Sequence, residues 1–122
     1  MRALIVDDSR FMRGHLRRML TALGFESEAA CDGEAGLKLL RDGPPFDLAL
    51  VDWNMPVMNG LEMLKNICAE KFTEMKVMMV TSEAETESIC RALESGADEY
   101  LMKPFDTEAL REKLALLGLV EG

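Results

Sequence analysis

The segment Leu48–Val51 is a run of apolar residues that ends in a carboxylate, Asp52, before a loop closes on Pro56. Because polar and apolar side chains do not alternate in it, the run predicts a strand buried on both faces, as in a parallel sheet. A carboxylate at the exit of such a strand is costly unless another group pairs with it. The ends of the neighbouring strands must therefore supply partners for Asp52.

Three other short apolar runs end in polar side chains in the same way. These polar groups are a pair of acids, a pair of hydroxyls and a lysine before proline, at Asp7-Asp8, Thr81-Ser82 and Lys103-Pro104. The carboxyl ends of parallel strands share one edge of the sheet, and ligands bind there where the strand order reverses. The sequence therefore predicts a functional site at that edge.

Apolar runs alternate with segments of helical periodicity along the whole chain. Strands are predicted at residues 3–6, 27–31, 47–52, 76–80 and 98–102. Helices are predicted to begin at caps and to end near glycines, with Ser9, Asp32, Asn59 and Asp106 or Thr107 as caps and Gly24, Gly43 and Gly96 at the ends. This alternation predicts an α/β fold of one domain, residues 1–122, with helices on both faces of a parallel sheet.

Composition excludes several classes of function. The net charge is −8 with no dense basic block, which argues against nucleic acid and anionic membranes as direct partners. The three cysteines have neither metal-ligand spacing nor a disulfide framework, and the N-terminus does not resemble a signal peptide. We therefore expect reduced thiols in a cytoplasmic protein.

The predicted site has a definite chemistry. Asp7, Asp8 and Asp52 bring three carboxylates together, and hard oxygen ligands of this kind suit Mg²⁺. Lys103 adds a positive charge and Thr81 a hydroxyl donor, which together suit a phosphoryl group. No glycine-rich nucleotide loop is present, so a carboxylate that itself accepts the phosphoryl group is the favoured interpretation.

The same residues carry a resemblance to a known family. Asp7-Asp8, Asp52, Thr81 and Lys103-Pro104, in this order and spacing, resemble the receiver domain of bacterial two-component response regulators. The string from Asp52 to Pro56, with Tyr100 and Phe105, is most similar to the chemotaxis regulators of that family. The resemblance covers essentially the whole chain and implies a flavodoxin-like (βα)5 fold with strand order 2-1-3-4-5.

The resemblance implies a role for each matching acid. Asp52 would accept a phosphoryl group from a phosphohistidine on a sensor histidine kinase or phosphotransfer domain. Asp8 and Asp52 would bind Mg²⁺ directly, together with the backbone carbonyl of Asn54, and Asp7 would act mainly through a metal-bound water.

Other matching residues are implied to stabilise the phosphoryl group or to respond to it. Lys103 would pair with Asp52, and its peptide bond to Pro104 would be cis. Thr81 would move to hydrogen-bond a phosphoryl oxygen, and Tyr100 would change rotamer in response.

Two further positions, Asn54 and Glu83, match sites that tune the lifetime of the phosphoryl group in the family. The family's output surface lies on the fourth helix, fifth strand and fifth helix. In this chain residues 83–87, which open the fourth helix, are strongly acidic and disfavour an acidic partner peptide there.

The leading hypothesis is a stand-alone response regulator that binds an output protein when phosphorylated, in chemotaxis or motility signalling. The flagellar motor switch is one candidate partner and a phosphatase another. The alternatives are a receiver domain cut from a longer transcription factor or output enzyme, and a phosphate sink or relay intermediate. A true aspartyl phosphatase is disfavoured, because Asn54 stands where that class needs a second acid. The protein is thus expected to catalyse only its own phosphorylation and dephosphorylation.

The first predicted helix leaves one alternative open. Its stripe of arginines, Arg10, Arg13 and Arg17, is either a solvated face or a docking edge for an acidic or phosphorylated partner. His15, the only histidine, lies among them and is expected to be a solvated surface residue.

Overall fold

The structure is a computed structural model that describes residues 1–55, 57–72, 74–82 and 86–121. The strands are β1 (Arg2–Val6), β2 (Glu26–Ala30), β3 (Leu48–Asp52), β4 (Lys76–Ser82) and β5 (Glu99–Lys103). The helices are α1 (Arg10–Ala22), α2 (Gly33–Asp42), α3 (Gly60–Ala69), α4 (Thr86–Glu94) and α5 (Thr107–Leu116). Strands and helices alternate strictly, as the sequence predicts.

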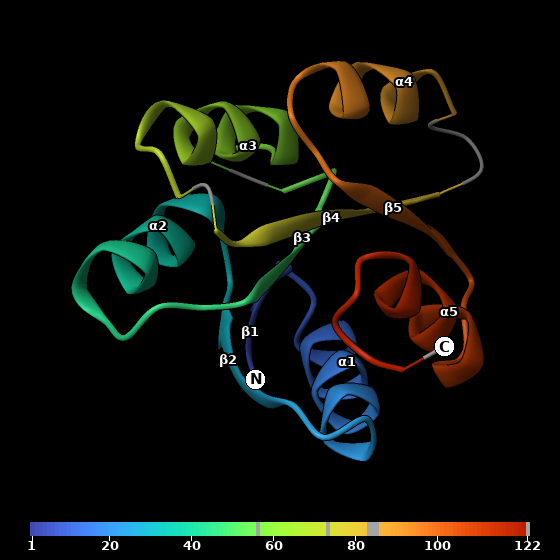
Figure 1. Ribbon diagram of the computed structural model, residues 1–122. Coiled ribbons are helices and arrows are strands. Elements are labelled where there is room, and N and C mark those ends of the chain that lie inside the picture. The colour runs from blue at the N-terminus through green and yellow to red at the C-terminus, as the bar shows by residue number, and fades with distance from the viewer. Residues whose placement is uncertain (56, 73, 83–85, 122) are drawn as a thin grey trace.

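The five strands form one parallel sheet in the order β2-β1-β3-β4-β5 (Figure 1). This order confirms the flavodoxin-like fold. Strand β3 lies at the centre of the sheet, and all five of its residues are buried. Strands β2 and β5 form the two edges.

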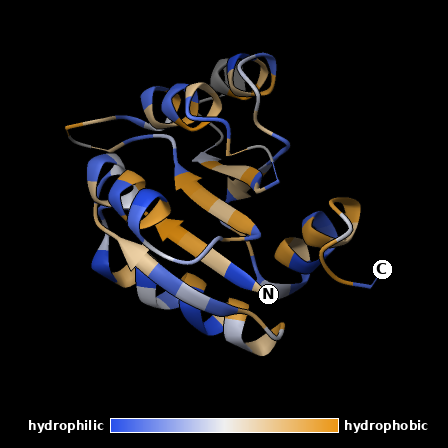
Figure 2. Ribbon diagram, turned by 60° about the vertical axis from the view of Figure 1, so that its left-hand side comes forward, coloured by the Kyte–Doolittle hydropathy of each residue, from blue (hydrophilic) through white to orange (hydrophobic). Residues whose placement is uncertain are grey.

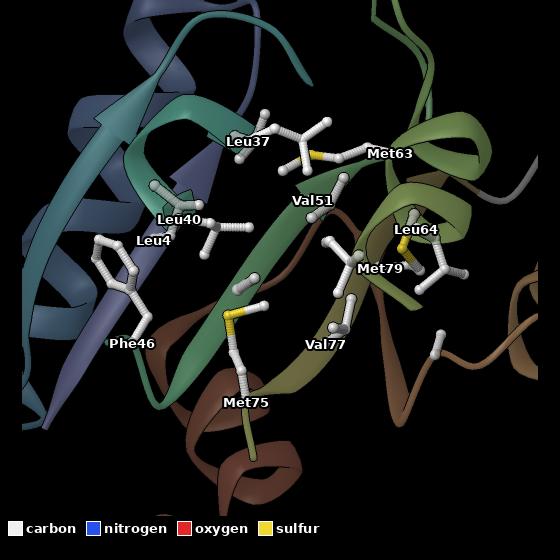
Figure 3. Close-up of a cluster of buried hydrophobic side chains, with 14 of the residues drawn as sticks. Leu4, Leu37, Leu40, Phe46, Val51, Met63, Leu64, Met75, Val77 and Met79 are labelled. Atoms are coloured by element: carbon white, nitrogen blue, oxygen red, sulfur yellow. The ribbon is translucent and has the colours of Figure 1, made fainter. Parts of the chain in front are cut away.

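Two layers of apolar side chains cover the two faces of the sheet. One layer packs α2, α3 and α4 against the sheet through residues such as Leu37, Met63 and Ala92 (Figure 3). The other packs α1 and α5 through residues such as Leu16 and Leu110. Figure 2 shows the matching distribution of hydropathy along the chain. The inner strands are strongly apolar, whereas the helices have one apolar and one polar face.

The helix caps arise from local sequence signals. Ser9, Asp32 and Asp106 each accept a hydrogen bond from a backbone N–H in the first turn of α1, α2 and α5. Asn59 and Glu62 form a reciprocal capping box at the start of α3. These caps fix where each of the four helices begins, and so fix the loops that follow β1, β2, β3 and β5.

Element boundaries differ from the sequence predictions by one or two residues. Strand β2 begins and ends one residue earlier than expected, and β4 continues through Thr81 and Ser82 because both still pair with β5. Helix α1 ends at Ala22, with Gly24 following in the left-handed conformation at φ +89°. None of the helices in the described ranges is long and apolar enough to cross a membrane.

Candidate functional site

Three carboxylates converge at the carboxyl ends of β1 and β3. Strand β1 is the direct neighbour of β3, and Val6 pairs in register with Val51, so Asp7 and Asp52 leave the sheet side by side. One oxygen each of Asp7, Asp8 and Asp52 lies within 4.8 Å of the others. Asp7 and Asp52 are 1% and 7% exposed, whereas Asp8 faces solvent. The geometry therefore has two buried acids and one accessible acid.

The Asp7 side chain is held in place by one hydrogen bond, but its second carboxylate oxygen lacks a hydrogen-bond partner among the described residues. Its Oδ1 accepts a hydrogen bond from the Ser9 N–H at 2.8 Å, and Arg13 donates to the backbone carbonyl of Asp7 at 2.8 Å. Its Oδ2 is buried and has no hydrogen-bond donor among the described residues. An orphaned carboxylate oxygen beside two further carboxylates fits a hard divalent cation such as Mg²⁺.

Lys103 reaches this acidic cluster from the end of β5. Its Nζ lies 3.4 Å from Oδ1 of Asp52 and 4.0 Å from Oδ2 of Asp7. Strand β5 is two strands away from β3, so the lysine side chain spans the end of β4. The peptide bond between Lys103 and Pro104 is cis.

The ionisation of the buried acids is perturbed. Burial, reinforced by the charge of Asp7, raises the pKa of Asp52 to about 6, although Lys103 and the Asn54 backbone N–H oppose the rise. Burial also raises the pKa of Asp7, with the Asp8 charge adding to the rise. One lysine thus does not offset the combined effect of burial and neighbouring negative charge on these acids, and a bound cation would favour their ionised forms.

Thr81 and Tyr100 lie on the path from this cluster to the β5 edge. Thr81 is buried near the end of β4, one residue beyond the partner of Asp52 in the ladder, and its hydroxyl donates to the Ser82 carbonyl at 3.4 Å. Tyr100 is half-buried, and the Lys113 Nζ lies 3.9 Å from the centre of its ring. Thr81 pairs with Met102, two residues after Tyr100, so by strand alternation both side chains project from the α4 face of the sheet.

The loop after β3 places two more residues beside the acids. Asn54 is exposed, and its backbone N–H is directed at Asp52. Trp53 is half-buried, and its backbone N–H donates to the Val80 carbonyl at 2.9 Å, which ties the loop to β4. Pro56 and Glu83, the latter a predicted lifetime position, lie outside the described residues.

Two features of α1 differ from what sequence reasoning provided. His15 is half-buried rather than fully solvated: its ring centroid lies 5.9 Å from that of Phe11, on which it stacks, and 6.3 Å from that of Phe105. The role of Arg13 in anchoring the Asp7 backbone was not predicted. The hydrogen bond from the Ser9 N–H to the Asp7 side chain could have been predicted from the sequence. An Asp side chain commonly accepts from the backbone N–H two residues later, which forms an Asx turn.

Comparison with known proteins identifies the family of the chain. Residues 3–115 match the family described as response regulator receiver domain. The chain is 43% identical over 116 residues to the chemotaxis protein CheY-3 of Vibrio cholerae, covering 93% of this chain and 88% of that protein. It is 40% identical to the chemotaxis protein CheY of Pseudomonas aeruginosa, with 93% of each covered.

Solved structures show the same arrangement. A CheY-like receiver domain protein from Methanospirillum hungatei superposes with a TM-score of 0.86 at 35% identity, covering 95% of this chain and 91% of that one. CheY4 of Vibrio cholerae superposes with a TM-score of 0.84 at 32% identity, covering 98% of each chain. The family match spans residues 3–115 and the relatives cover most of the chain, so the chain belongs to the response regulator receiver domain family.

Proposed function

We propose that this protein is a phosphorylation switch of a two-component system in which Asp52 is the phosphoryl acceptor. The observation that carries the proposal is the buried Asp52 carboxylate, within 4.8 Å of two further acids and 3.4 Å from the Lys103 ammonium. Asp8, Asp52 and the Asn54 backbone carbonyl would hold Mg²⁺, with Asp7 acting through a metal-bound water. When bound, the metal supplies positive charge to the carboxylates and to the incoming phosphoryl oxygens.

The transfer step follows from the positions of these residues. An Asp52 oxygen attacks the phosphorus of a phosphohistidine. The P–O bond to Asp52 forms as the P–N bond to the donor breaks, and the released imidazole takes up a proton from solvent. Lys103 holds Asp52 in place before transfer and can pair with a phosphoryl oxygen afterwards. Thr81, near the end of the adjacent strand β4, would donate a hydrogen bond from its hydroxyl to a second phosphoryl oxygen.

We further propose that residues 1–122 act as a single receiver that signals through α4, β5 and α5. The similarity to chemotaxis proteins favours a role in chemotaxis or motility. Leu93 on α4 and Leu116 on α5 are exposed at 42% and 73%, which offers apolar area to an output protein. A sink or relay role remains the second candidate, and a pulldown of output proteins with and without a phosphoryl mimic separates the two.

The direct test is phosphorylation by acetyl phosphate with Mg²⁺, followed by peptide mapping of the modified protein. We expect one phosphoryl group, located on Asp52, and no modification when the metal is removed with a chelator. The Asp52→Asn variant should remain unmodified. Undiminished modification of this variant, or modification independent of metal, would be incompatible with the proposed site.

Replacing Thr81 with alanine is expected to separate phosphorylation from the response. A phosphoryl group on Asp52 offers acceptor oxygens that the Thr81 hydroxyl can reach, and the space that Thr81 vacates lies on the face from which Tyr100 projects. Coupling of this kind is typically about 1–3 kcal/mol. Beryllium fluoride, a phosphoryl mimic, should therefore still bind to Thr81→Ala but shift the amide resonances around Tyr100 and α4 much less. Equal shifts in the variant and the wild type would show that Thr81 does not couple phosphorylation of Asp52 to the response around Tyr100 and α4.

Replacing Phe11 with alanine is expected to slow transfer from a protein donor while leaving small donors unaffected. Phe11 is 73% exposed, and a hollow of about 380 Å³ lies between it, His15, Phe105 and the active lysine, Lys103. An exposed aromatic that shares a hollow with Lys103, the lysine paired with Asp52, is suited to contact a phosphohistidine domain, and its loss should cost about tenfold in rate.

The matched control for Phe11→Ala is Leu116→Ala, because Leu116 is equally exposed but lies on α5. Rates should be measured with acetyl phosphate and with a phosphorylated histidine phosphotransfer domain that donates to the wild type. A larger loss for Leu116→Ala, or an equal loss with both donors, would place the docking surface elsewhere.

A further inference from the structure

A groove runs along β2, the edge strand farthest from β5. Two hollows flank this strand, with volumes of about 650 and 290 Å³, and both are lined by Arg13 and Ala29. The larger lies against α2 and includes the apolar side chains of Ala35 and Leu39, whereas the smaller lies against α1. Figure 1 shows β2 at the rim of the sheet between these helices. The two hollows together are called the β2 groove below.

The floor of the groove is formed by the backbone groups of β2 that face away from β1, of which the Ser27 carbonyl accepts a hydrogen bond of 3.5 Å from Arg17. Among the described strands, β2 pairs only with β1. Glu26 N–H donates to Met1, and Ala30 C=O accepts from Asp7, so Glu26 and Ala30 direct these groups inward. Because successive residues of a strand alternate, Ser27 and Ala29 direct their N–H and C=O groups outward. An edge of this kind can accept one further strand.

The α1 wall of the groove is basic, although the chain as a whole carries a charge of −8. Helix α1 contains four arginines and no acid, and three of them, Arg10, Arg13 and Arg17, line the smaller hollow. Lys38 adds a positive charge from α2, at the larger hollow.

Two acids, Glu28 and Asp42, also line the larger hollow, which therefore carries as many acids as basic residues, whereas the smaller hollow is lined by arginines and no acid. Glu28 is already paired with Arg2 at 2.8 Å, and Asp42 follows Lys38 by four residues on α2, so it lies on the same helix face as that lysine. Among the described residues, the Arg17 guanidinium donates only to the Ser27 carbonyl, at 3.5 Å, and it can turn to another partner. Charge complementarity therefore calls for a negatively charged occupant beside α1.

We propose that the β2 groove binds an extended, acidic polypeptide segment of a partner protein, which adds to the sheet as a sixth strand. The segment's backbone pairs with Ser27 and Ala29. Its carboxylates face Arg17 on one side and Lys38 on the other, and its small apolar side chains cover Ala35. A nucleic acid has no row of amides for the strand edge, and a second copy would bring one arginine-rich α1 against another.

The position of the groove has a consequence for signalling. Strands β2 and β5 are opposite edges of the sheet. A partner on β2 therefore leaves the α4, β5 and α5 face open, and one molecule can carry this segment and an output protein together.

The test is a titration of the full, unphosphorylated chain with a nine-residue peptide that alternates glutamate and valine. We expect amide shifts confined to β2, α1 and α2, slower hydrogen exchange at Ser27 and Ala29, and a Kd below about 1 mM. A peptide with lysine in place of glutamate should not bind. A peptide with proline at the inner positions should not bind either, because proline has no N–H to pair.

A charge-matched pair of variants isolates the groove. R17E/K38E should weaken peptide binding by at least about tenfold. K65E/R91E changes the net charge equally on α3 and α4 and should leave binding intact. The proposal would be overturned if both pairs weakened binding equally, if the amide shifts were dispersed over the protein, or if the peptide did not bind at about 1 mM. It would also be overturned if a single-stranded oligonucleotide bound more tightly than the peptide, or if the chain alone self-associated. Acetyl phosphate labelling of R17E/K38E reports separately on the phosphoryl acceptor.

Discussion

Without bound metal, the Asp52→Asn variant is expected to be about 3 kcal/mol more stable than the wild-type protein at pH 7. Burial and the neighbouring Asp7 raise the pKa of Asp52 from 3.8 to about 6. A rise of this size corresponds to about 3 kcal/mol of lost stability once the carboxyl is ionised in both the folded and unfolded states. Asparagine has nearly the same shape and no charge to bury.

The sign of this effect fixes its pH dependence. The raised pKa means that the folded protein holds a proton on Asp52 more tightly than the unfolded chain does. The stabilising contribution of the protonated acid is therefore complete below pH 3.8 and is lost as the pH rises to about 6. The advantage of Asp52→Asn should be small at pH 4 and reach its plateau above pH 6.

Denaturant unfolding from pH 4 to pH 8 in the presence of a chelator measures this difference. The control is Asp42→Asn, which removes one exposed carboxylate far from the site and should change stability little at any pH. Adding Mg²⁺ should narrow the gap between wild type and Asp52→Asn, since the metal binds only the folded wild-type site strongly. A gap that does not vary with pH would contradict the assigned ionisation of Asp52.

Replacing Gly60 with alanine is expected to cost about 3 kcal/mol, an overpacking penalty at the upper end of the usual range. A Cβ on this first residue of α3 would lie 2.5 Å from the Asp52 carbonyl oxygen and 2.8 Å from the Trp53 Cα. Both are backbone atoms and cannot rotate away. Helix α3 must therefore shift from β3, and that shift displaces the loop whose Asn54 carbonyl would bind the metal.

Thermal and chemical unfolding of Gly60→Ala, together with a Mg²⁺ titration, measure both consequences. Gly14→Ala is the matched control. Its Cβ would meet only a flexible Arg18 side-chain atom at 3.5 Å, and alanine has a higher helix propensity than glycine in the interior of α1. We expect Gly14→Ala to be neutral or stabilising by up to about 1 kcal/mol. If the Gly60→Ala protein were as stable as the wild type and its metal affinity were unchanged, the prediction would be wrong. Helix α3 could then move away from β3 without loss of stability or disturbance of the metal site.

The parts of the fold predicted correctly are those with local causes. The unbroken apolar run before Asp52 identified the central strand, because only a strand covered on both faces tolerates such a run. The caps at Asp32 and Asn59 were predicted because each contact spans three residues. Convergence of Asp7 with Asp52 followed from the rule that parallel strands end at one edge.

The parts predicted less well depend on contacts between distant segments. Strand β2 lies at an edge with a weak apolar pattern, so its register came from pairing with β1, one residue earlier than expected. His15 is half-buried because Phe105 reaches it from the loop after β5, which helical periodicity in α1 cannot reveal. The hydrogen bond from Arg13 to the Asp7 carbonyl spans only six residues, but it depends on the angle at which α1 leaves β1, which local sequence signals do not specify.

The placement of Trp53 has a practical consequence for kinetics. It is the single tryptophan of the chain, it is half-buried, and it follows Asp52 directly. Indole emission responds to nearby charge and to water access, so the native, unlabelled protein carries one optical probe beside the reacting carboxylate. Stopped-flow mixing can then time metal entry, phosphoryl transfer and hydrolysis as successive phases of one signal, and the Asp52→Asn variant, which lacks the last two, supplies the baseline.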